Sequence, residues 1–128
     1  MSAVAPEGAR TFERVGVLGF GTMGMGIVYA AAAAGCSVTV LETDESRIEA
    51  GFVALDRFLA RGVAIGKSSE ADAAELRGRI TGVTDPSAFA DTELVIEAVF
   101  EDFEAKRAVL GRVTAFLGGE ALVATNTS

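Results

Sequence analysis

The sequence predicts an α/β fold, a doubly wound parallel sheet. Short, β-branched apolar runs alternate with segments of helical periodicity from residue 14 onward, and the first run leads directly into a glycine-rich turn. Apolar residues make up 50% of the 128 positions, enough for one domain with a substantial core. Because alternating strands and helices form parallel sheets through right-handed crossovers, we expect the strand order 3-2-1-4-5, with a ligand site at the switch point of the sheet.

The first expected strand, residues 15–18, ends in a Gly-x-Gly-x-x-Gly turn at Gly19, Gly21 and Gly24. Gly19 would leave the strand at dihedral angles that other residues avoid, and Gly21 would let a diphosphate approach the backbone. Gly24 would let the following helix, residues 22–34, pack close to the strand. Unpaired N–H groups at the start of that helix favour an anion. The turn alone predicts an anion site, and its setting predicts a dinucleotide.

The second strand, residues 37–41, is followed by a candidate for ribose recognition. Glu42 lies 18 residues past Gly24, close to the separation at which a carboxylate meets the adenosine ribose in this kind of fold. Such a carboxylate repels a 2′-phosphate and therefore favours NAD over NADP. We do not expect the nearby Arg47 to reverse that preference. The alternative is that Glu42 and the two acids after it only place negative charge at the start of the next helix.

The rest of the chain completes the alternation of helices and strands. Apolar residues at helical intervals predict an amphipathic helix with Ile48, Phe52, Leu55 and Leu59 on one face. Two glycines, Gly62 and Gly66, are expected to close it. Ser68 or Ser69 can cap a short helix that follows. Further expected elements are strands at 79–84, 94–99 and 121–124, a helical turn at 88–90 and a helix at 102–117. The nine-residue link at 85–93 is shorter than most parallel crossovers. It is therefore the least secure connection in the predicted topology.

Composition excludes several classes of function. A net charge of -7 argues against nucleic acid or an anionic membrane as a partner. Residues 15–41 carry no charge and are long enough to span a bilayer, but six glycines break them into strand, helix and strand, which disfavours that interpretation. The single cysteine, Cys36, cannot form an internal disulfide, and without any histidine it lacks a partner base, so we expect a buried thiol in a cytoplasmic protein. We expect no metal site. Residues 1–13 lack the pattern of a secretory signal and are expected to form a flexible tail.

Four motifs together carry a family resemblance. They are residues 15–26, residues 95–102 (Val-Ile-Glu-Ala-Val-Phe-Glu-Asp), Lys106, and residues 124–128 (Ala-Thr-Asn-Thr-Ser). In this order they resemble the cofactor-binding domain of the 3-hydroxyacyl-CoA dehydrogenases, and the likeness covers residues 14–128. The resemblance implies a Rossmann fold that binds NAD.

The resemblance also implies roles for individual residues. The cofactor contacts it implies are Gly19, Gly21, Thr22, Met23, Gly24, Glu42, Ala98, Glu101, Lys106 and Asn126. Asn126 and Ser128 would stand near the reacting carbonyl and 3-hydroxyl of an acyl thioester, carried by coenzyme A or by a carrier protein. Each has a plainer alternative: Lys106 as a solvated helix lysine, Glu101 as a charge favouring a helix start, and residues 126–128 as a glycosylation acceptor, which we disfavour.

One departure from the family pattern limits the expectation. Oxidation of a 3-hydroxyl needs a group that takes its proton, and the family uses a histidine located after the Asn-Thr-Ser motif. This sequence contains no histidine, and the family's all-helical second domain, which forms its homodimer, is absent from it. We therefore expect a domain of a longer enzyme that binds NAD, is inactive alone, and self-associates through apolar surface.

Two other functional classes remain open from the sequence. One is a nucleotide-binding or interaction module that works without catalysis. The other is a flavin-binding or S-adenosylmethionine-binding domain, because both also place an acid after the second strand. Leu18, directly before the first glycine of the turn, and Val28 in the helix speak mildly against these two.

Overall fold

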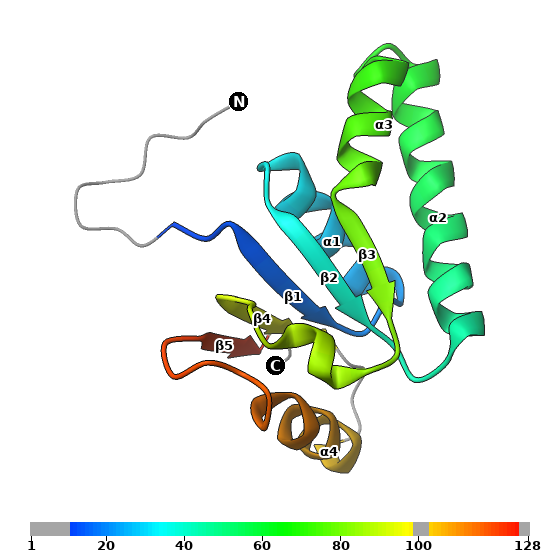
Figure 1. The fold of residues 1–128 in the computed structure, drawn as a ribbon. Helices are drawn as coiled ribbons and strands as arrows, with labels where there is room; N and C mark the ends of the chain where they lie inside the picture. The colour runs from blue at the N-terminus through cyan, green and yellow to red at the C-terminus, as the bar shows by residue number, and fades with distance from the viewer. Residues whose placement is uncertain (1–10, 99–102, 126–128) are drawn as a thin grey trace.

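The computed structural model of this chain describes residues 11–98 and 103–125 (Figure 1). Strands and helices alternate along this part of the chain almost throughout. In order they are β1 (Arg14–Leu18), α1 (Thr22–Ala33), β2 (Ser37–Leu41), α2 (Glu45–Ala64), α3 (Glu70–Gly78), β3 (Ile80–Val83), the 3-10 helix η1 (Pro86–Phe89), β4 (Leu94–Glu97), α4 (Phe103–Thr114) and β5 (Leu122–Thr125).

The five strands form one parallel sheet in the order β3-β2-β1-β4-β5, which confirms the predicted topology. The central strand β1 pairs with both halves of the sheet: Val15 is aligned with Val38 of β2 on one side and with Leu94 of β4 on the other. The chain therefore winds outward in opposite directions from β1. The carboxyl ends of β1 and β4 lie side by side where the direction changes, which is the position at which doubly wound sheets bind ligands.

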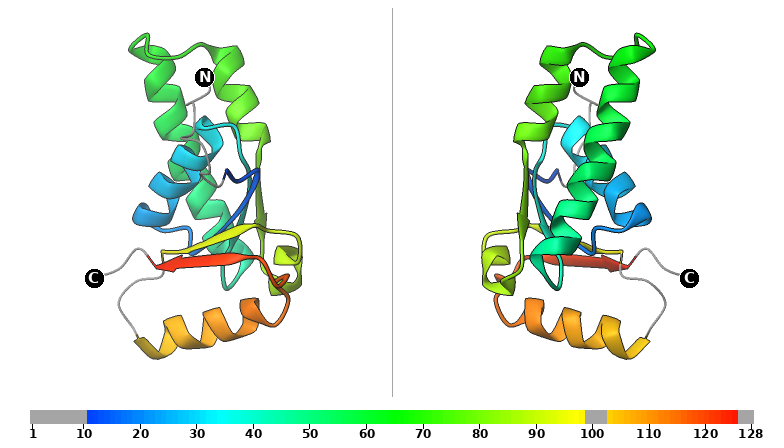
Figure 2. Two further views of the ribbon diagram at one scale, coloured as in Figure 1. Left: turned by 90° about the vertical axis from the view of Figure 1, so that its left-hand side faces the viewer. Right: turned by 90° about the vertical axis from the view of Figure 1, so that its right-hand side faces the viewer.

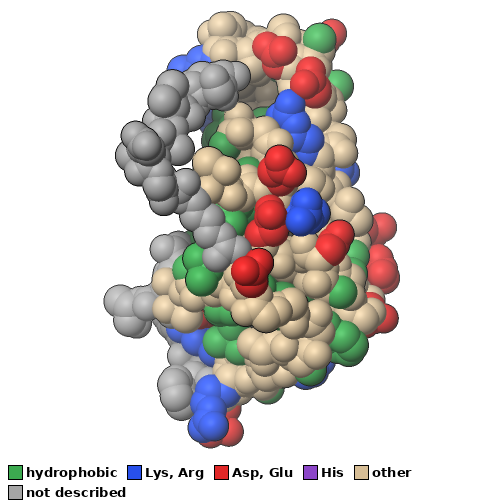
Figure 3. Space-filling view, turned by 60° about the vertical axis from the view of Figure 1, so that its left-hand side comes forward, with side chains coloured by type: hydrophobic (Ala, Val, Ile, Leu, Met, Phe, Trp, Pro, Cys, Tyr) green, Lys and Arg blue, Asp and Glu red, His purple; other side chains and the backbone are tan. Residues whose placement is uncertain are grey.

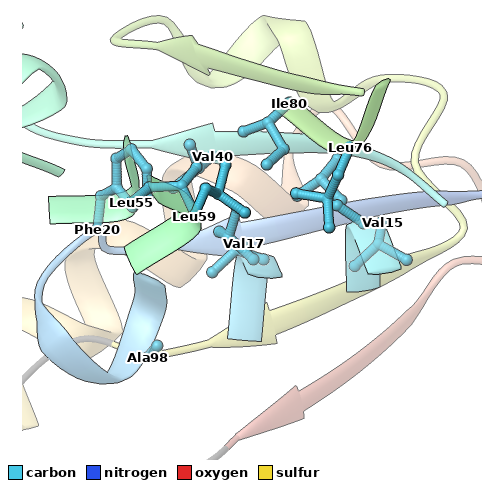
Figure 4. Packing of buried hydrophobic residues seen from close by; sticks show 12 residues of the cluster. Val15, Val17, Phe20, Val40, Leu55, Leu59, Leu76, Ile80 and Ala98 are labelled. Carbon is cyan, nitrogen blue, oxygen red and sulfur yellow. The ribbon is translucent and has the colours of Figure 1, made fainter. Parts of the chain in front are cut away.

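Helices cover both faces of the sheet (Figure 2). On one face, α1, α2 and α3 pack over the larger core cluster, in which Leu55 and Leu59 of α2 are directed at Val17 and Val40 of the central strands (Figure 4). On the other face, η1 and α4 cover a smaller cluster centred on Phe89. Burial of apolar residues on both faces explains why the central strands are nearly continuous apolar runs.

In the short link between β3 and β4, the ring of Phe89 packs closely against the backbone of β1. The helical turn of this link is confirmed, although η1 begins at Pro86, two residues before the predicted start. Asp85 caps η1 by accepting a hydrogen bond from the N–H of Ser87 at 2.9 Å. Phe89 is fully buried over Gly16 of β1, where a Cβ would lie 2.5 Å from the phenyl ring. Because Gly16 has no side chain, the ring can lie against β1 and the link can remain short.

Several predicted boundaries shift by a few residues. The prediction that Gly62 closes the second helix was wrong, because α2 continues through Gly62 to Ala64 and the chain turns at Gly66, whose φ is +78°. Gly35 ends the α1 segment with a φ of +98°, as expected. Ser69 is the cap of α3, accepting a hydrogen bond from the N–H of Asp72 at 3.0 Å. At the far end, α4 stops at Thr114 rather than at residue 117.

Cys36 is half-buried at the start of β2. Its Sγ donates a hydrogen bond to the carbonyl of Phe12 at 3.3 Å. Burial raises the pKa of the thiol, and the charge of Glu93 raises it further. The predicted buried thiol is thus only half-buried, packed near the start of β2.

The described surface mixes charges of both signs. On the face drawn in Figure 3, Lys and Arg side chains lie among Asp and Glu side chains, with hydrophobic groups between them. Salt bridges between described residues include Arg77–Asp56 at 2.9 Å and Arg79–Glu75 at 2.8 Å. Within residues 11–98 and 103–125, no helix is long and apolar enough to cross a membrane.

Candidate functional site

The glycine turn has the geometry of an anion-binding loop. Gly19 has a φ of +98°, which only glycine adopts readily. A Cβ at Gly24 would lie 1.9 Å from the carbonyl oxygen of Gly19, so α1 starts in direct backbone contact with the turn. Gly21 differs, because a Cβ there would meet no atom of residues 11–98 and 103–125 within 4 Å. Among these residues, the space over Gly21 is therefore open to a ligand.

The N-terminus of α1 has no side-chain cap among the described residues. Its first turn also contains no acid. The first N–H groups of a helix lack intrahelical acceptors and carry partial positive charge. An anion placed at Thr22 and Met23 would therefore be stabilised by this end of the helix.

Glu42 is linked to the turn rather than to the following helix. Its Oε2 accepts a hydrogen bond from the N–H of Phe20 at 2.8 Å, and its Oε1 accepts one from the N–H of Thr43 at 3.0 Å. A carboxylate offers about four acceptor positions, so it retains capacity for hydroxyl groups of a ligand. Its position therefore favours the ribose interpretation over that of a charge supplied to α2.

The helix-capping role belongs to Asp44. Its Oδ1 accepts hydrogen bonds from the hydroxyl of Ser46 at 2.6 Å and from the N–H of Arg47 at 3.0 Å. These bonds, the Ser46 hydroxyl first, lower the pKa of the Asp44 carboxyl. Glu45 follows in the first turn of α2. The acids expected to act together thus have separate positions, and only Glu42 faces the glycine turn.

A cleft of about 510 Å³ opens at the switch point of the sheet. Six of the predicted cofactor residues line it: Gly19, Gly21, Thr22, Met23, Glu42 and Ala98. Gly24 is buried behind the turn. The structure thus brings together residues from the ends of β1, β2 and β4 that lie up to 79 positions apart in sequence. A second hollow, of about 350 Å³ between α2 and α3, lies away from the turn and is lined in part by the ion-paired Asp56 and Arg77.

The other predicted residues are not placed in this cleft. Lys106 is half-buried on α4 and is not among the residues that line it. Glu101, Asn126 and Ser128 lie outside the described residues. Their suggested roles at the nicotinamide and the substrate therefore stay predictions.

The structure also shows residues that the sequence analysis missed. Val109 and Arg112 of α4 line the cleft, together with Thr43 and Arg47 beside Glu42. The sequence predicted a helix at 102–117 but gave no reason to direct residue 109 or residue 112 at a ligand. A three-residue spacing that puts both on one helix face was the available signal.

The burial of Glu97 was also not predicted. This residue is fully buried at the carboxyl end of β4, aligned with Leu18 of β1 and Thr125 of β5. Alternation along β4 directs it to the same face as Val95, into the layer beneath α4. The signal in the sequence is an acid at a position where strand alternation requires an apolar side chain.

Comparison with known proteins agrees with this geometry. Residues 14–128 match the family described as the NAD-binding domain of 3-hydroxyacyl-CoA dehydrogenase. A 3-hydroxybutyryl-CoA dehydrogenase of Mycobacterium tuberculosis is 39% identical over 117 residues, which cover 91% of this chain and 41% of that protein.

Two crystal structures show the same fold at similar levels of identity. The M. tuberculosis protein FadB2 superposes with a TM-score of 0.90 at 38% identity, over 93% of this chain and 42% of that one. The (S)-3-hydroxybutyryl-CoA dehydrogenase of Ralstonia eutropha gives a TM-score of 0.88 at 32% identity, over 92% and 42% of the two chains. The chain thus spans about two fifths of the length of these relatives.

Proposed function

Because this chain belongs to the 3-hydroxyacyl-CoA dehydrogenase family, whose NAD-binding domain it matches, we propose that it binds NAD(H) in the cleft at the glycine turn. In the whole protein it would present the cofactor to a 3-hydroxyacyl thioester. The observation that carries this proposal concerns the described part of the chain, where the space over Gly21 is open and no side chain caps the adjacent N-terminus of α1.

Residues of the cleft suit the diphosphate and the adenosine ribose of the dinucleotide. The diphosphate would lie over Gly21 against the N–H groups at the start of α1. Glu42 would accept hydrogen bonds from the adenosine ribose through the acceptor positions that Phe20 and Thr43 leave free. Its negative charge in the same place disfavours a 2′-phosphate, so NAD is expected rather than NADP.

When bound, NAD supplies the acceptor for a hydride, and the domain's part is to hold and orient it. We propose that Glu101 and Lys106 contact the nicotinamide side of the cofactor, and that Asn126 and Ser128 contact the carbonyl and hydroxyl of the substrate. The base that takes the hydroxyl proton would be a histidine contributed from outside residues 14–128. An acyl thioester substrate, a homodimeric parent enzyme and a cytoplasmic location belong to the same proposal.

Titration of the chain with NADH and NADPH, followed by the fluorescence of the reduced nicotinamide, tests the proposal. NADH should bind about tenfold or more tightly than NADPH, a difference of about 1.4 kcal/mol. Equal affinity for the two would refute the role of Glu42, and absence of NADH binding would refute the proposed function. An assay with 3-hydroxybutyryl-CoA should detect no turnover by this chain alone, because the proton acceptor is missing from it.

A further inference from the structure

Part of the lining of the cleft comes from α4. Val109 and Arg112 stand three residues apart, on one face of that helix, and both line the cleft. Glu42 and Thr43, which follow β2, line the same cleft. An apolar side chain and a planar cation therefore share the cleft with the carboxylate to which we assign the ribose.

The two arginines that line the cleft differ in their contacts with protein side chains. Nε of Arg47 lies 3.9 Å from Oδ2 of Asp44, the residue that caps α2. Arg112 forms no hydrogen bond or ion pair with any residue in the described part of the chain. Its guanidinium is therefore free to take up a ligand without breaking a protein contact.

The position of Arg112 defines which part of a dinucleotide it would meet. The diphosphate belongs at the glycine turn and the ribose at Glu42, so the base continues from Glu42 into the space bounded by Thr43 and α4. Adenine is flat, and it is held best between an apolar surface and a planar partner. A guanidinium group stacks on aromatic faces with both its charge and its plane.

We infer that Arg112 forms the stacking wall of the adenine subsite, with Val109 as the apolar surface beside it. This inference rests on the proposed function, because it names the subsite in which the same cofactor would be held. Arg112 would determine affinity for the adenosine half of the cofactor and leave the nicotinamide half unaffected. A contact with a 2′-phosphate is the competing role for the same cation, and the carboxylate of Glu42 in the same cleft disfavours it.

The test compares Arg112→Ala and Arg112→Lys with the unaltered chain. Lysine keeps the charge but lacks the plane, so it separates stacking from simple attraction. Arg57→Ala removes the same charge from an exposed site on α2 away from the cleft and serves as the matched control. Affinities for NADH, NADPH and reduced nicotinamide mononucleotide are measured by fluorescence, and that for AMP by displacement of NADH.

Stacking predicts a specific pattern of losses. Arg112→Ala and Arg112→Lys should both bind NADH and AMP about 3- to 30-fold more weakly, the range of a cation–π contact. Binding of reduced nicotinamide mononucleotide should be unchanged, and Arg57→Ala should match the unaltered chain for every nucleotide.

Four results would overturn the inference. They are full retention of AMP affinity in Arg112→Ala, full rescue by Arg112→Lys, an equal loss for AMP and nicotinamide mononucleotide, and a loss of NADPH affinity larger than that of NADH. The first three leave NADH binding, and hence the proposed function, intact. If the unaltered chain binds no nucleotide at all, the proposed function fails and the inference fails with it.

Discussion

The carboxylate of Glu42 accepts a hydrogen bond from the backbone N–H of Phe20 at 2.8 Å, so the acid at the end of β2 holds the middle of the glycine turn. The same turn is held to β2 by the N–H of Gly19, which donates to the carbonyl of Leu41 at 2.9 Å. The residue proposed to bind ribose thus also shapes the loop proposed to bind the diphosphate.

Substitutions of Glu42 should separate these two roles. Glu42→Gln keeps one oxygen that can accept from Phe20 but removes the charge, so NADPH should gain relative to NADH while thermal stability changes little. Glu42→Ala also removes the bond to the turn and should lower the free energy of unfolding by about 1–2 kcal/mol. Thermal melts and parallel titrations check both. Equal stability of the two variants would show that the bond to Phe20 does not stabilise the fold.

Gly21→Ala should weaken nucleotide binding without harming the fold. Its Cβ would meet no atom of the described residues within 4 Å, but it would project into the space we assign to the diphosphate. NADH affinity should fall by about tenfold or more, which corresponds to about 1.4 kcal/mol. The melting temperature should stay close to that of the unaltered chain. Unchanged NADH affinity would place the diphosphate elsewhere.

Gly24→Ala should instead disrupt the fold of the turn itself. The added Cβ would lie 1.9 Å from the carbonyl oxygen of Gly19, and neither group belongs to a flexible side chain. We expect a loss of about 3 kcal/mol in unfolding free energy. The added Cβ of Gly26→Ala, two residues on in the same helix, would meet no described atom within 4 Å, and the change should raise stability by about 0.5–1 kcal/mol. Denaturant unfolding of the two variants provides the comparison, and similar values for both would contradict the close packing at Gly24.

The crossover between β3 and β4 should be sensitive to Gly16. Gly16→Ala should cost about 2–3 kcal/mol, because its Cβ would lie 2.5 Å from the ring of Phe89. Adding Phe89→Leu should relieve the clash, so the double variant should be more stable than the sum of the single changes by about 1 kcal/mol. Gly78→Ala, at a position open to solvent, is the matched control. If the changes in unfolding free energy of the two single variants simply add in the double variant, the ring of Phe89 and the strand at Gly16 are not in tight contact.

Cys36 should react slowly with alkylating reagents at neutral pH. Burial, assisted by the charge of Glu93, raises its pKa, so the fraction of thiolate is below that of a free cysteine. A raised pKa in the folded state stabilises the fold fully below the unfolded pKa, and that contribution is lost as pH rises through the folded pKa. Labelling with iodoacetamide across pH, with the urea-unfolded chain as reference, measures the shift directly. An identical pH profile in both states would refute it.

The topology followed from the sequence because alternation, the glycine turn and the handedness of crossovers are local or general signals. Contacts between distant residues did not. Phe89 over Gly16 and the ring of Phe20 against Gly51, where a Cβ would lie 2.1 Å away, join segments that no periodicity connects. Gly51 accordingly lies on the buried face of α2, in a stripe for which the sequence suggested only large apolar residues.

Part of the candidate site could also be predicted from the sequence. Its glycine turn and Glu42 carry a spacing that the geometry of the fold imposes. Val109 and Arg112 line the cleft because of how α4 lies against the sheet. Helical periodicity does not specify that arrangement. The burial of Glu97 was not predicted for a related reason, since a buried acid breaks the apolar pattern from which burial is inferred.

The wholly parallel sheet has a consequence for how the cleft is assembled. No two neighbouring strands can form a hairpin, and β1 pairs with β4 through residues 79 positions apart in sequence, compared with 23 for β1 and β2. Distant pairings require closure of longer loops and are expected to form late. The cleft therefore comes into existence only with one of the last folding steps. A nucleotide that binds there favours the completed sheet over partly folded states, and refolding yields should rise when it is present.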